Sequence, residues 1–322
     1  LMAYLSTPLA LDINQAERAA ELSKCDLMTG MVGEFPELQG LMGSYYAKED
    51  GENSSVANAL YEQYLPRFAG DDLPNSSMGL ALSLADRLDT LVGIFAIGQK
   101  PSGDKDPFKL RRHALAVVRL VRMTPPKLTL SSLITEALSA YAPLFELDNA
   151  HVAELQAFIL ERLPSFYQSS GISQDVVNAV KACQSEGLYD FDHRVKALSQ
   201  FITRPEAASL SAACKRVTNL LQQVDGTSVD VEEMLLQEAA EKQLFETIQS
   251  MEQAILPLYE KNDYTSILAQ LASLKQPVDT FFEGIMVMVD DKAVKMNRLA
   301  LLSRLQRLLM GTADISLLQL SQ

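Results

Sequence analysis

Apolar side chains recur at intervals of three and four residues along almost the whole chain. This spacing places them on one side of a helix, where they can be buried against neighbouring helices. In the first half it predicts helices over residues 14–30, 36–49, 54–69, 76–97, 107–124, 130–143 and 149–163. In the second half it predicts a helix that ends at Leu221, and further helices over about 230–256, 264–274, 278–288 and 292–310. The chain is therefore predicted to be all-α.

Local signals mark several helix starts. Asp106 followed by Pro107 predicts a start, because the carboxylate accepts from the free amides of the first turn and proline lacks an N–H that would be unpaired there. Asp148 and Ser131 are predicted as caps by the same logic. The segment Thr203-Arg204-Pro205-Glu206 has the form of a capping box and predicts the start of the helix that ends at Leu221.

Proline, serine and glycine interrupt the helical spacing between Pro164 and Gly187, with Ser185 near the end of the interruption. These residues favour turns and loops. We therefore expect a boundary between two helical domains within or just after this span. The first domain is expected over residues 1–180 and the second over residues 186–322. The chain shows no repeat of fixed period and no low-complexity tract.

The composition is that of a soluble globular protein, with 48% apolar and 21% charged side chains in 322 residues, enough for two ordinary cores. No apolar run reaches the roughly eighteen residues that span a membrane, and no signal-peptide pattern opens the chain, so we expect a cytoplasmic protein with no membrane partner. Three cysteines without CxxC spacing favour reduced thiols over a disulfide framework or a zinc site. The chain begins at Leu1 rather than at methionine, and we expect it to be a piece of a longer protein.

Basic residues gather in one part of an acidic chain. The formal net charge is −13, yet no acidic residue stands between Asp106 and Glu136. This local reversal of charge suits a phosphate backbone. The alternative is a solvated helix face, or a face paired with acids from elsewhere in the fold. The candidates for contact with the RNA backbone are Lys105, Lys109, Arg111, Arg112, Arg119 and Arg122, all but Arg111 near one face at a period of 3.6 residues.

A second group of candidates lies on the predicted helix that ends at Leu221. Lys215, Arg216 and Asn219 fall on its polar side. Paired cations with an amide on the next turn suit a phosphate and a base edge together. We therefore predict that these residues contact a phosphate and a base edge of an RNA.

Asp290 and Asp291 precede a second basic run, which contains Arg298. Each carboxylate is expected either to cap the following helix or to accept a hydrogen bond from the exocyclic amine of a cytosine. Arg298 completes this second set of candidates for RNA contact. Four aromatic residues are expected either to stack on unpaired bases or to belong to the core: Tyr189, Phe191, Phe281 and Phe282.

Cys25-Asp26 and the later segment 85–89 (ADRLD) resemble the metal-binding pattern of the helical HD phosphohydrolases. Those enzymes hold a metal with a histidine, a His-Asp pair and a distant aspartate. Here Cys25 stands in place of the paired histidine, and no histidine precedes His113. One thiol cannot replace the missing imidazoles. We therefore expect no metal and no catalytic residue, with Asp26 and Asp86 in hydrogen bonds or ion pairs to neighbours such as Lys24 or Arg87. The motifs GxxxxGK[ST], GxGxxG and GxSxG are absent as well.

Longer segments, spread over nearly the whole chain, resemble the beta subunit of the bacterial two-subunit glycyl-tRNA synthetases. They are KCDLMTGMVGEFPELQGLMG (24–43), YLPRFAGDDLP (64–74), LADRLDTLVGIFAIGQKPSGDKDPFKLRR (84–112), KRVTNLL (215–221), VMVDDKAVKMNRLALLSRL (287–305) and ADISLLQ (313–319). The chain corresponds in this resemblance to the C-terminal half of that subunit. The resemblance implies a degenerate HD-like helical domain followed by a helical-bundle anticodon-binding domain of the arginyl-tRNA synthetase type. It also implies that the aminoacylation site, which uses ATP and magnesium, lies on a separate alpha subunit, in an assembly of two alpha and two beta chains.

The resemblance and the charge pattern together predict a part of a glycine–tRNA ligase that positions tRNA(Gly) through backbone and anticodon contacts. The expected partners are tRNA(Gly), the alpha subunit and a second beta subunit, and we expect no DNA partner and no cofactor in this part of the enzyme. Glycine anticodons end in two cytosines, which makes a carboxylate at residue 290 or 291 chemically suitable for reading them. Two other functions are considered: a purely structural module that holds the subunits together, and an HD-type metal phosphohydrolase.

Overall fold

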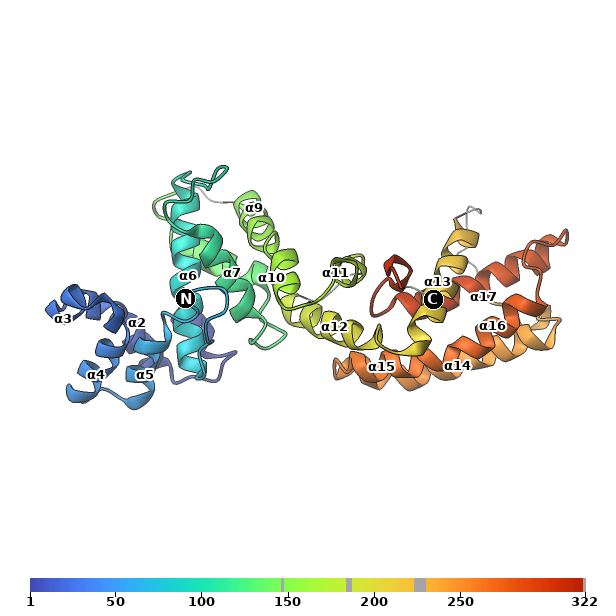
Figure 1. Ribbon diagram of the computed structural model, residues 1–322, viewed down its shortest axis with the longest axis horizontal. Coiled ribbons are helices and arrows are strands. Elements are labelled where there is room, and N and C mark those ends of the chain that lie inside the picture. The colour runs from blue at the N-terminus through green and yellow to red at the C-terminus, as the bar shows by residue number, and fades with distance from the viewer. Residues whose placement is uncertain (146–147, 184–186, 223–229, 321–322) are drawn as a thin grey trace. The chain divides into compact units, whose positions relative to one another are not determined.

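The computed structural model describes residues 1–145, 148–183, 187–222 and 230–320. Every regular element in these ranges is a helix, and the β pairing found among the described residues is an isolated bridge between Ser102 and Lys105. The all-α prediction is therefore confirmed for the part of the chain that the structure describes (Figure 1). Within the same residues, no helix is long and apolar enough to cross a membrane.

The chain divides into two compact units, whose described residues are 1–145, 148–166 and 187–189 in unit 1, and 167–183, 190–222 and 230–320 in unit 2. Two helices cross the division, α10 (Leu163–Ser169) and α12 (Leu188–Phe201). The other helices of unit 1 are α1 (Met2–Ser6), α2 (Ile13–Glu21), η1 (Cys25–Met28), α3 (Gly30–Glu34), η2 (Pro36–Leu38), α4 (Leu41–Glu49), α5 (Ser54–Glu62), α6 (Ser77–Ala96), α7 (Leu110–Val121), α8 (Leu130–Ser139) and α9 (Asn149–Leu160).

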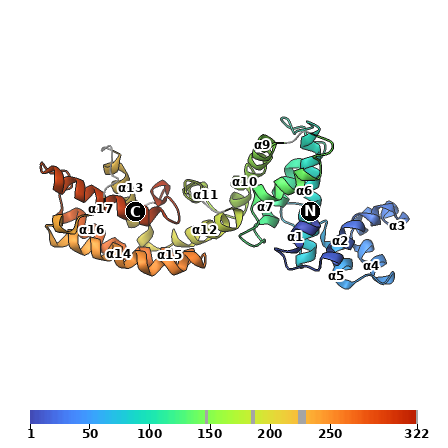
Figure 2. The ribbon, with the colours of Figure 1, turned by 180° about the vertical axis from the view of Figure 1, so that it is seen from behind.

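Helix α6 forms the centre of unit 1. It contacts α1, α2, α5, α7, α8 and α9, and Figures 1 and 2 both show α7 beside it. Leu84, Leu88 and Leu91 are fully buried, as expected for a helix that is apolar on most sides. Near its start α6 lies close to α5, because a Cβ on Gly79 would fall 1.9 Å from Oε2 of Glu62. The glycine therefore sets the spacing between these two helices.

The remaining helices of unit 2 are α11 (Gln174–Lys181), α13 (Pro205–Leu221), η3 (Glu233–Leu235), α14 (Ala239–Glu260), α15 (Tyr264–Leu271), η4 (Ala272–Leu274), α16 (Lys275–Gly284), α17 (Lys292–Met310) and η5 (Ile315–Leu317). Helix α14 packs against α15, α16 and α17, and α13 packs against α16 and α17. Both ribbon views show α14 and α16 side by side. Fully buried side chains such as Ile248, Phe281 and Leu301 form the core between them.

The segment that follows α17 is bound to helices from the start of unit 2. Arg194 of α12 donates to the carbonyl of Gly311 at 2.7 Å, and Ser211 of α13 donates to the carbonyl of Ile315 at 2.9 Å. The backbone N–H of Asp314 donates to the carbonyl of Ala179 in α11 at 2.8 Å. The beginning and the end of unit 2 are thus joined through backbone groups.

The four predicted helix starts have different outcomes. Helix α7 begins at Leu110 rather than at Pro107, because Lys109 has a left-handed backbone (φ 57°) that interrupts the helix. Asp106 still accepts the N–H groups of Leu110 and Arg111 at 2.8 and 3.0 Å. The cap at Asp148 is confirmed.

The other two predicted caps are wrong. Helix α8 is capped by Thr129, whose hydroxyl accepts from the N–H of Ser132, rather than by Ser131. The capping box at residues 203–206 does not form, because the Thr203 hydroxyl donates instead to the carbonyl of Gln200. At α8 the neighbouring Thr129 takes the cap in place of Ser131, whereas no side chain caps α13, although that helix begins at Pro205 and ends at Leu221 as predicted.

The interruption predicted between residues 164 and 187 contains helices α10 and α11, and α12 follows it, so three helices were missed. Pro164 is the second residue of α10, where a missing N–H is tolerated. Ser185 lies outside the described residues. The helix predicted over 230–256 lies at Ala239–Glu260 instead, after the short turn η3.

Candidate functional site

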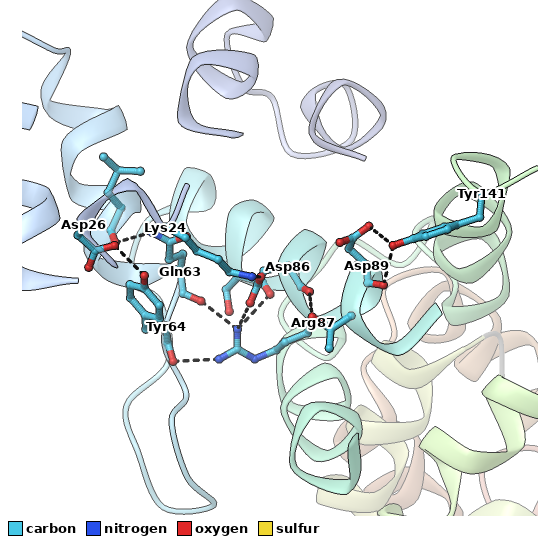
Figure 3. A network of polar contacts seen from close by, with 11 residues as sticks. Lys24, Asp26, Gln63, Tyr64, Asp86, Arg87, Asp89 and Tyr141 are labelled. Carbon is cyan, nitrogen blue, oxygen red and sulfur yellow. Dashed lines mark hydrogen bonds and ion pairs between the residues drawn. The ribbon is translucent and has the colours of Figure 1, made fainter. Parts of the chain in front are cut away.

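A network of polar side chains lies where the sequence placed the degenerate metal motif (Figure 3). The predicted helix over residues 14–30 is in fact broken after Glu21, and Lys24 adopts a left-handed backbone (φ 62°) before the short helix η1 begins. This break turns Lys24 toward Asp86 of the central helix α6, while Asp26 lies beside Tyr64. The residues of the motif are thus brought together.

Asp26 is buried and is held by two donors. Its Oδ2 accepts from the N–H of Gly40 at 2.6 Å, and its Oδ1 accepts from the hydroxyl of Tyr64 at 2.8 Å. Burial and the neighbouring carboxylate raise the pKa of Tyr64, so the phenol remains protonated and continues to donate. Both oxygens of Asp26 are therefore engaged within the protein.

Asp86 is paired with cations of the chain itself. The Lys24 ammonium forms an ion pair with its Oδ1, and Nη1 of Arg87 lies 3.9 Å from its Oδ2. Arg87 is buried and donates through its two terminal nitrogens to the carbonyls of Gln63, Ser83, Tyr64 and Pro66 at 2.9–3.2 Å. The predicted ion pairs of Asp86 with Lys24 and Arg87 are confirmed.

These residues do not fit a divalent metal. The two carboxylates are already used by Tyr64, Gly40 and Lys24, and the Cys25 thiol is exposed. Among the described residues, no group of three or more histidine, cysteine, aspartate or glutamate side chains is arranged to hold a metal ion. A lysine ammonium beside Asp86 supplies positive charge at the position where the HD pattern would call for a metal.

A pocket of about 410 Å³ opens over this network. Its lining comprises Pro36, Glu37, Gln39, Tyr64, Pro66, Arg67, Asp86, Arg87, Lys109, Arg112 and His113. Burial, and then the nearby Arg87, lower the pKa of His113, so the imidazole is neutral at pH 7. Its Nδ1 is buried and has no hydrogen-bond partner among the described residues.

The basic run contains three exposed and three half-buried cations. Lys105, Lys109 and Arg112 are exposed, and no ion pair or hydrogen bond of their side chains is found among the described residues. Lys105 lies in the turn closed by the bridge to Ser102, and Lys109 and Arg112 lie at the first turn of α7. The single helix face predicted from residue 105 onward therefore begins only at residue 110.

The half-buried members of the run are anchored to their own unit. Arg111 donates to the carbonyl of Gly103. Arg119 donates to the carbonyls of Phe68 and Asp71 at 3.1 and 2.6 Å. Arg122 lies over the ring of Phe166, with its guanidinium carbon 4.4 Å from the ring centre. These three contacts join α7 and the residue after it to the loop before α7, to the segment between α5 and α6, and to α10, a role that the sequence did not predict.

In unit 2, Lys215, Arg216 and Asn219 are all exposed on α13, on the face opposite the buried Cys214 and Val217. The Lys215 ammonium donates to the carbonyl of Leu318 at 2.8 Å. The guanidinium of Arg216 stacks over the ring of Phe282 on α16, at 4.1 Å from the ring centre. Phe282 is half-buried, whereas Phe191 and Phe281 belong to the core.

The three remaining candidates differ in exposure. Asp290 is exposed, and Asp291 caps α17 by accepting the N–H groups of Ala293 and Val294 at 2.9 and 3.2 Å. Arg298 is only 7% exposed and pairs with the fully buried Glu241. Its guanidinium is therefore turned away from the surface that an RNA would contact. The partner lies 57 residues earlier in the chain, so no local pattern announced this pair.

Most of unit 2 is similar to a family of anticodon-binding domains. Residues 210–316, from α13 to η5, match the family model of the DALR anticodon binding domain. Residues 1–182 match the family model of the glycyl-tRNA synthetase beta subunit. The chain belongs to the glycyl-tRNA synthetase beta subunit family.

Curated relatives agree with this assignment. The chain is 46% identical over 319 residues to a glycine–tRNA ligase beta subunit of Acinetobacter baumannii, which covers 99% of this chain and 46% of the relative. It is 47% identical over 321 residues to the corresponding protein of Aliivibrio fischeri, covering 99% of this chain and 46% of the relative. With the protein of Acinetobacter baylyi it shares 48% over 304 residues, covering 94% and 44%. The chain thus spans just under half the length of these relatives.

Proposed function

We propose that this chain is the tRNA-binding part of a glycine–tRNA ligase beta subunit. It positions tRNA(Gly) while the alpha subunit joins glycine to the tRNA with ATP and magnesium. The match of the helices α13 to η5 to an anticodon-binding family is the observation that carries the proposal. The domain division proposed with it is an HD-like domain without a metal over residues 1–180 and an anticodon-binding domain over residues 186–322. The alpha subunit and a second beta subunit are the proposed protein partners.

In unit 1 the proposed contacts to the tRNA backbone are the exposed cations Lys105, Lys109 and Arg112. Phosphate contacts need only accessible positive charge, and they position the RNA without reading its sequence. The other three arginines of the run support these contacts indirectly. Arg111 and Arg119 donate to backbone carbonyls of unit 1, and Arg122 stacks on the ring of Phe166.

In unit 2 the proposed reading surface comprises Lys215, Arg216 and Asn219, with Asp290 and Asp291 as acceptors for cytosine amines. The Arg216 guanidinium is ordered by Phe282, which lowers the entropy lost when it contacts a base. Asp291 keeps one function in the fold as the cap of α17. Arg298 is left out of the reading surface, because its burial and its pairing with Glu241 reserve it for the core.

Binding of tRNA(Gly) to the 322-residue chain as a function of salt concentration tests the backbone contacts. Replacing Lys105 and Arg112 by glutamate should weaken binding and flatten the slope of log K against log salt by about 0.9 per lost phosphate contact. Lys48→Glu, an exposed lysine on α4 outside the basic run, is the matched control and should leave the slope close to that of the parent. An unchanged slope in the double variant would show that the run is merely solvated.

Discrimination between tRNA(Gly) and a version with altered anticodon cytosines tests the reading surface. Arg216→Ala and Asn219→Ala should each reduce that discrimination by about 1–3 kcal/mol if the side chain contacts a base edge. Asp291→Asn is the informative change at the cap, because asparagine still caps the helix but removes the charge. If the ratio of the two affinities stays the same in all three folded variants, unit 2 is a backbone clamp or an assembly element.

A further inference from the structure

We propose that the pocket over the Lys24–Asp86 pair is a metal-free binding site for a phosphate monoester. The monoester is carried either by a mononucleotide or by the end of an RNA chain. This inference goes beyond the proposed function, because it assigns a pocket for a small phosphate ligand. Its first test needs no tRNA.

The lining of the pocket carries more positive than negative charge. Four basic residues, Arg67, Arg87, Lys109 and Arg112, face two acidic ones, Glu37 and Asp86. Two of the cations are already satisfied, because Arg67 is paired with Asp71 outside the pocket lining and Arg87 donates to four backbone carbonyls.

Lys109 and Arg112 are the available cations. They are exposed, and no ion pair or hydrogen bond of their side chains occurs within the described ranges 1–145, 148–183, 187–222 and 230–320. An ammonium and a guanidinium suit the two charges and three acceptor oxygens of a monoester dianion. The first-turn amides of α7 are not part of the site, because Asp106 already accepts from Leu110 and Arg111.

The floor of the pocket explains why an anion can enter without a metal. A free Asp86 carboxylate there would repel a phosphate. The Lys24 ammonium sits directly on this carboxylate, and Arg87 approaches its other oxygen. Lys24 thus removes the repulsion that a divalent ion would otherwise have to remove.

Shape and polarity indicate a terminal phosphate on a ligand of nucleotide size. The volume of about 410 Å³ lies near the lower end of small-molecule sites, roughly 300–1,000 Å³. A monoester presents its phosphate at one end of the ligand, which a pocket lined by Lys109 and Arg112 can take, whereas an internal phosphodiester needs a groove through which the chain leaves on both sides. Pro36, Pro66 and the ring of Tyr64 offer apolar walls, and Gln39 offers both a donor and an acceptor. The unpartnered Nδ1 of His113 marks the same pocket as one whose polar groups are not all satisfied within the protein.

The first experiment compares AMP, inorganic phosphate and adenosine as ligands of the 322-residue chain by calorimetry, with a chelator present throughout. We expect AMP to bind at least about tenfold more tightly than adenosine, because only AMP reaches both cations with charge-assisted bonds. Inorganic phosphate should compete with AMP. Equal affinity for AMP and adenosine, or binding of AMP only after a divalent metal is added, would overturn the proposal. This comparison uses the unaltered protein and so does not depend on any variant folding.

The second experiment identifies the residues. Arg112→Gln removes one exposed cation, and Lys109→Asn removes the other while tolerating the left-handed backbone at that position. Each change should weaken AMP binding about tenfold or more, without affecting adenosine. Lys127→Gln, an exposed lysine outside the pocket lining, is the control and should bind AMP like the parent. AMP binding that survives the double variant would refute the assignment of the phosphate to this pocket.

The third experiment distinguishes the source of the phosphate. If the ligand is an RNA end, tRNA(Gly) that retains its 5′-phosphate should compete with AMP, and enzymatic removal of that phosphate should abolish the competition. If the ligand is a free mononucleotide, AMP should weaken the binding of tRNA(Gly) to the same extent with and without the 5′-phosphate of the tRNA, because Lys109 and Arg112 are also proposed contacts to the tRNA backbone. If the 322-residue chain binds AMP but not tRNA(Gly), the proposed function is overturned and the phosphate pocket is supported. If the chain binds tRNA(Gly) but not AMP, the pocket is overturned and the proposed function is supported.

Discussion

Arg298 lies inside unit 2, and replacing it by methionine should reduce stability without changing the discrimination between tRNAs. Oε1 of Glu241 forms an ion pair with the Arg298 guanidinium, whose Nη1 also donates to the carbonyl of Met286 at 2.8 Å. Oε2 of Glu241 accepts the N–H groups of Gln237 and Glu238 at 2.7 and 2.9 Å. With Glu241 at 0% and Arg298 at 7% exposure, both charges are shielded from water.

The expected magnitude follows from these contacts. Removing one member of a buried ion pair costs about 3–5 kcal/mol, because the remaining charge is left without compensation. Two backbone N–H groups continue to stabilise the Glu241 carboxylate after Arg298→Met, so we expect a loss near the lower end, about 3 kcal/mol. Changing Glu241 to methionine as well should recover part of this loss, because no unpaired charge then remains buried.

Urea unfolding followed by far-ultraviolet circular dichroism measures these differences, since the chain contains no tryptophan. The slope m should stay constant across the variants, so that shifts in midpoint report stability. Arg307→Met, on the exposed side of the same helix, is the control and should change the free energy of unfolding by no more than about 0.5 kcal/mol. If Arg298→Met left stability unchanged but reduced anticodon discrimination, Arg298 would be a reading residue and the argument from burial would be wrong.

Two further changes test the packing and the electrostatics of unit 1. Gly79→Ala should destabilise the protein by about 1–3 kcal/mol, because the new Cβ would meet Glu62. Thermal unfolding should show this loss as a lower melting temperature. Gly33→Ala is the control and should not lower the melting temperature, because its Cβ would meet nothing within 4 Å. Asp71 accepts from the guanidinium of Arg67, which lowers the pKa of Asp71 to about 2. The resulting stabilisation is present above the unfolded pKa of about 3.9 and disappears as the pH falls toward 2. Because Arg67 is largely exposed, we expect this ion pair to contribute only about 1 kcal/mol to the free energy of unfolding. Asp71→Asn should remove this pH dependence when unfolding is measured as a function of pH. If the stability of Asp71→Asn fell equally steeply in acid, the loss would belong to other carboxylates.

The periodic pattern predicted the helices best where the local signals agreed. Helix α17 lies at residues 292–310 as predicted, because a carboxylate cap at Asp291 and a continuous apolar spacing marked both ends. The helix over residues 14–30 was predicted as one piece, yet Lys24 turns left-handed and breaks it. At this turn Lys24 pairs with Asp86 on a distant helix, a contact that a local pattern does not contain.

The candidate residues show the same limit. The charge pattern selected Lys109 and Arg112, which are exposed, but it also selected Arg119, which is bonded to the loop carbonyls of Phe68 and Asp71. Charge along a sequence reports which residues are cationic, and tertiary contacts decide which of them remain accessible. The pocket itself required the fold, because its lining comes from segments between residues 36 and 113.

The closure of unit 2 by its final segment has a consequence during protein synthesis. Cys183 and Met310, which form a hydrogen bond, are 127 positions apart, and Arg194 and Gly311 are 117 positions apart. While the ribosome is still adding residues before 311, helices α11, α12 and α13 have already been synthesised. The backbone carbonyls to which α12 and α13 donate, those of Gly311 and Ile315, do not yet exist. Contacts of such long sequence separation form late and leave apolar faces uncovered in the meantime. The folding of unit 2 must therefore await the translation of this segment.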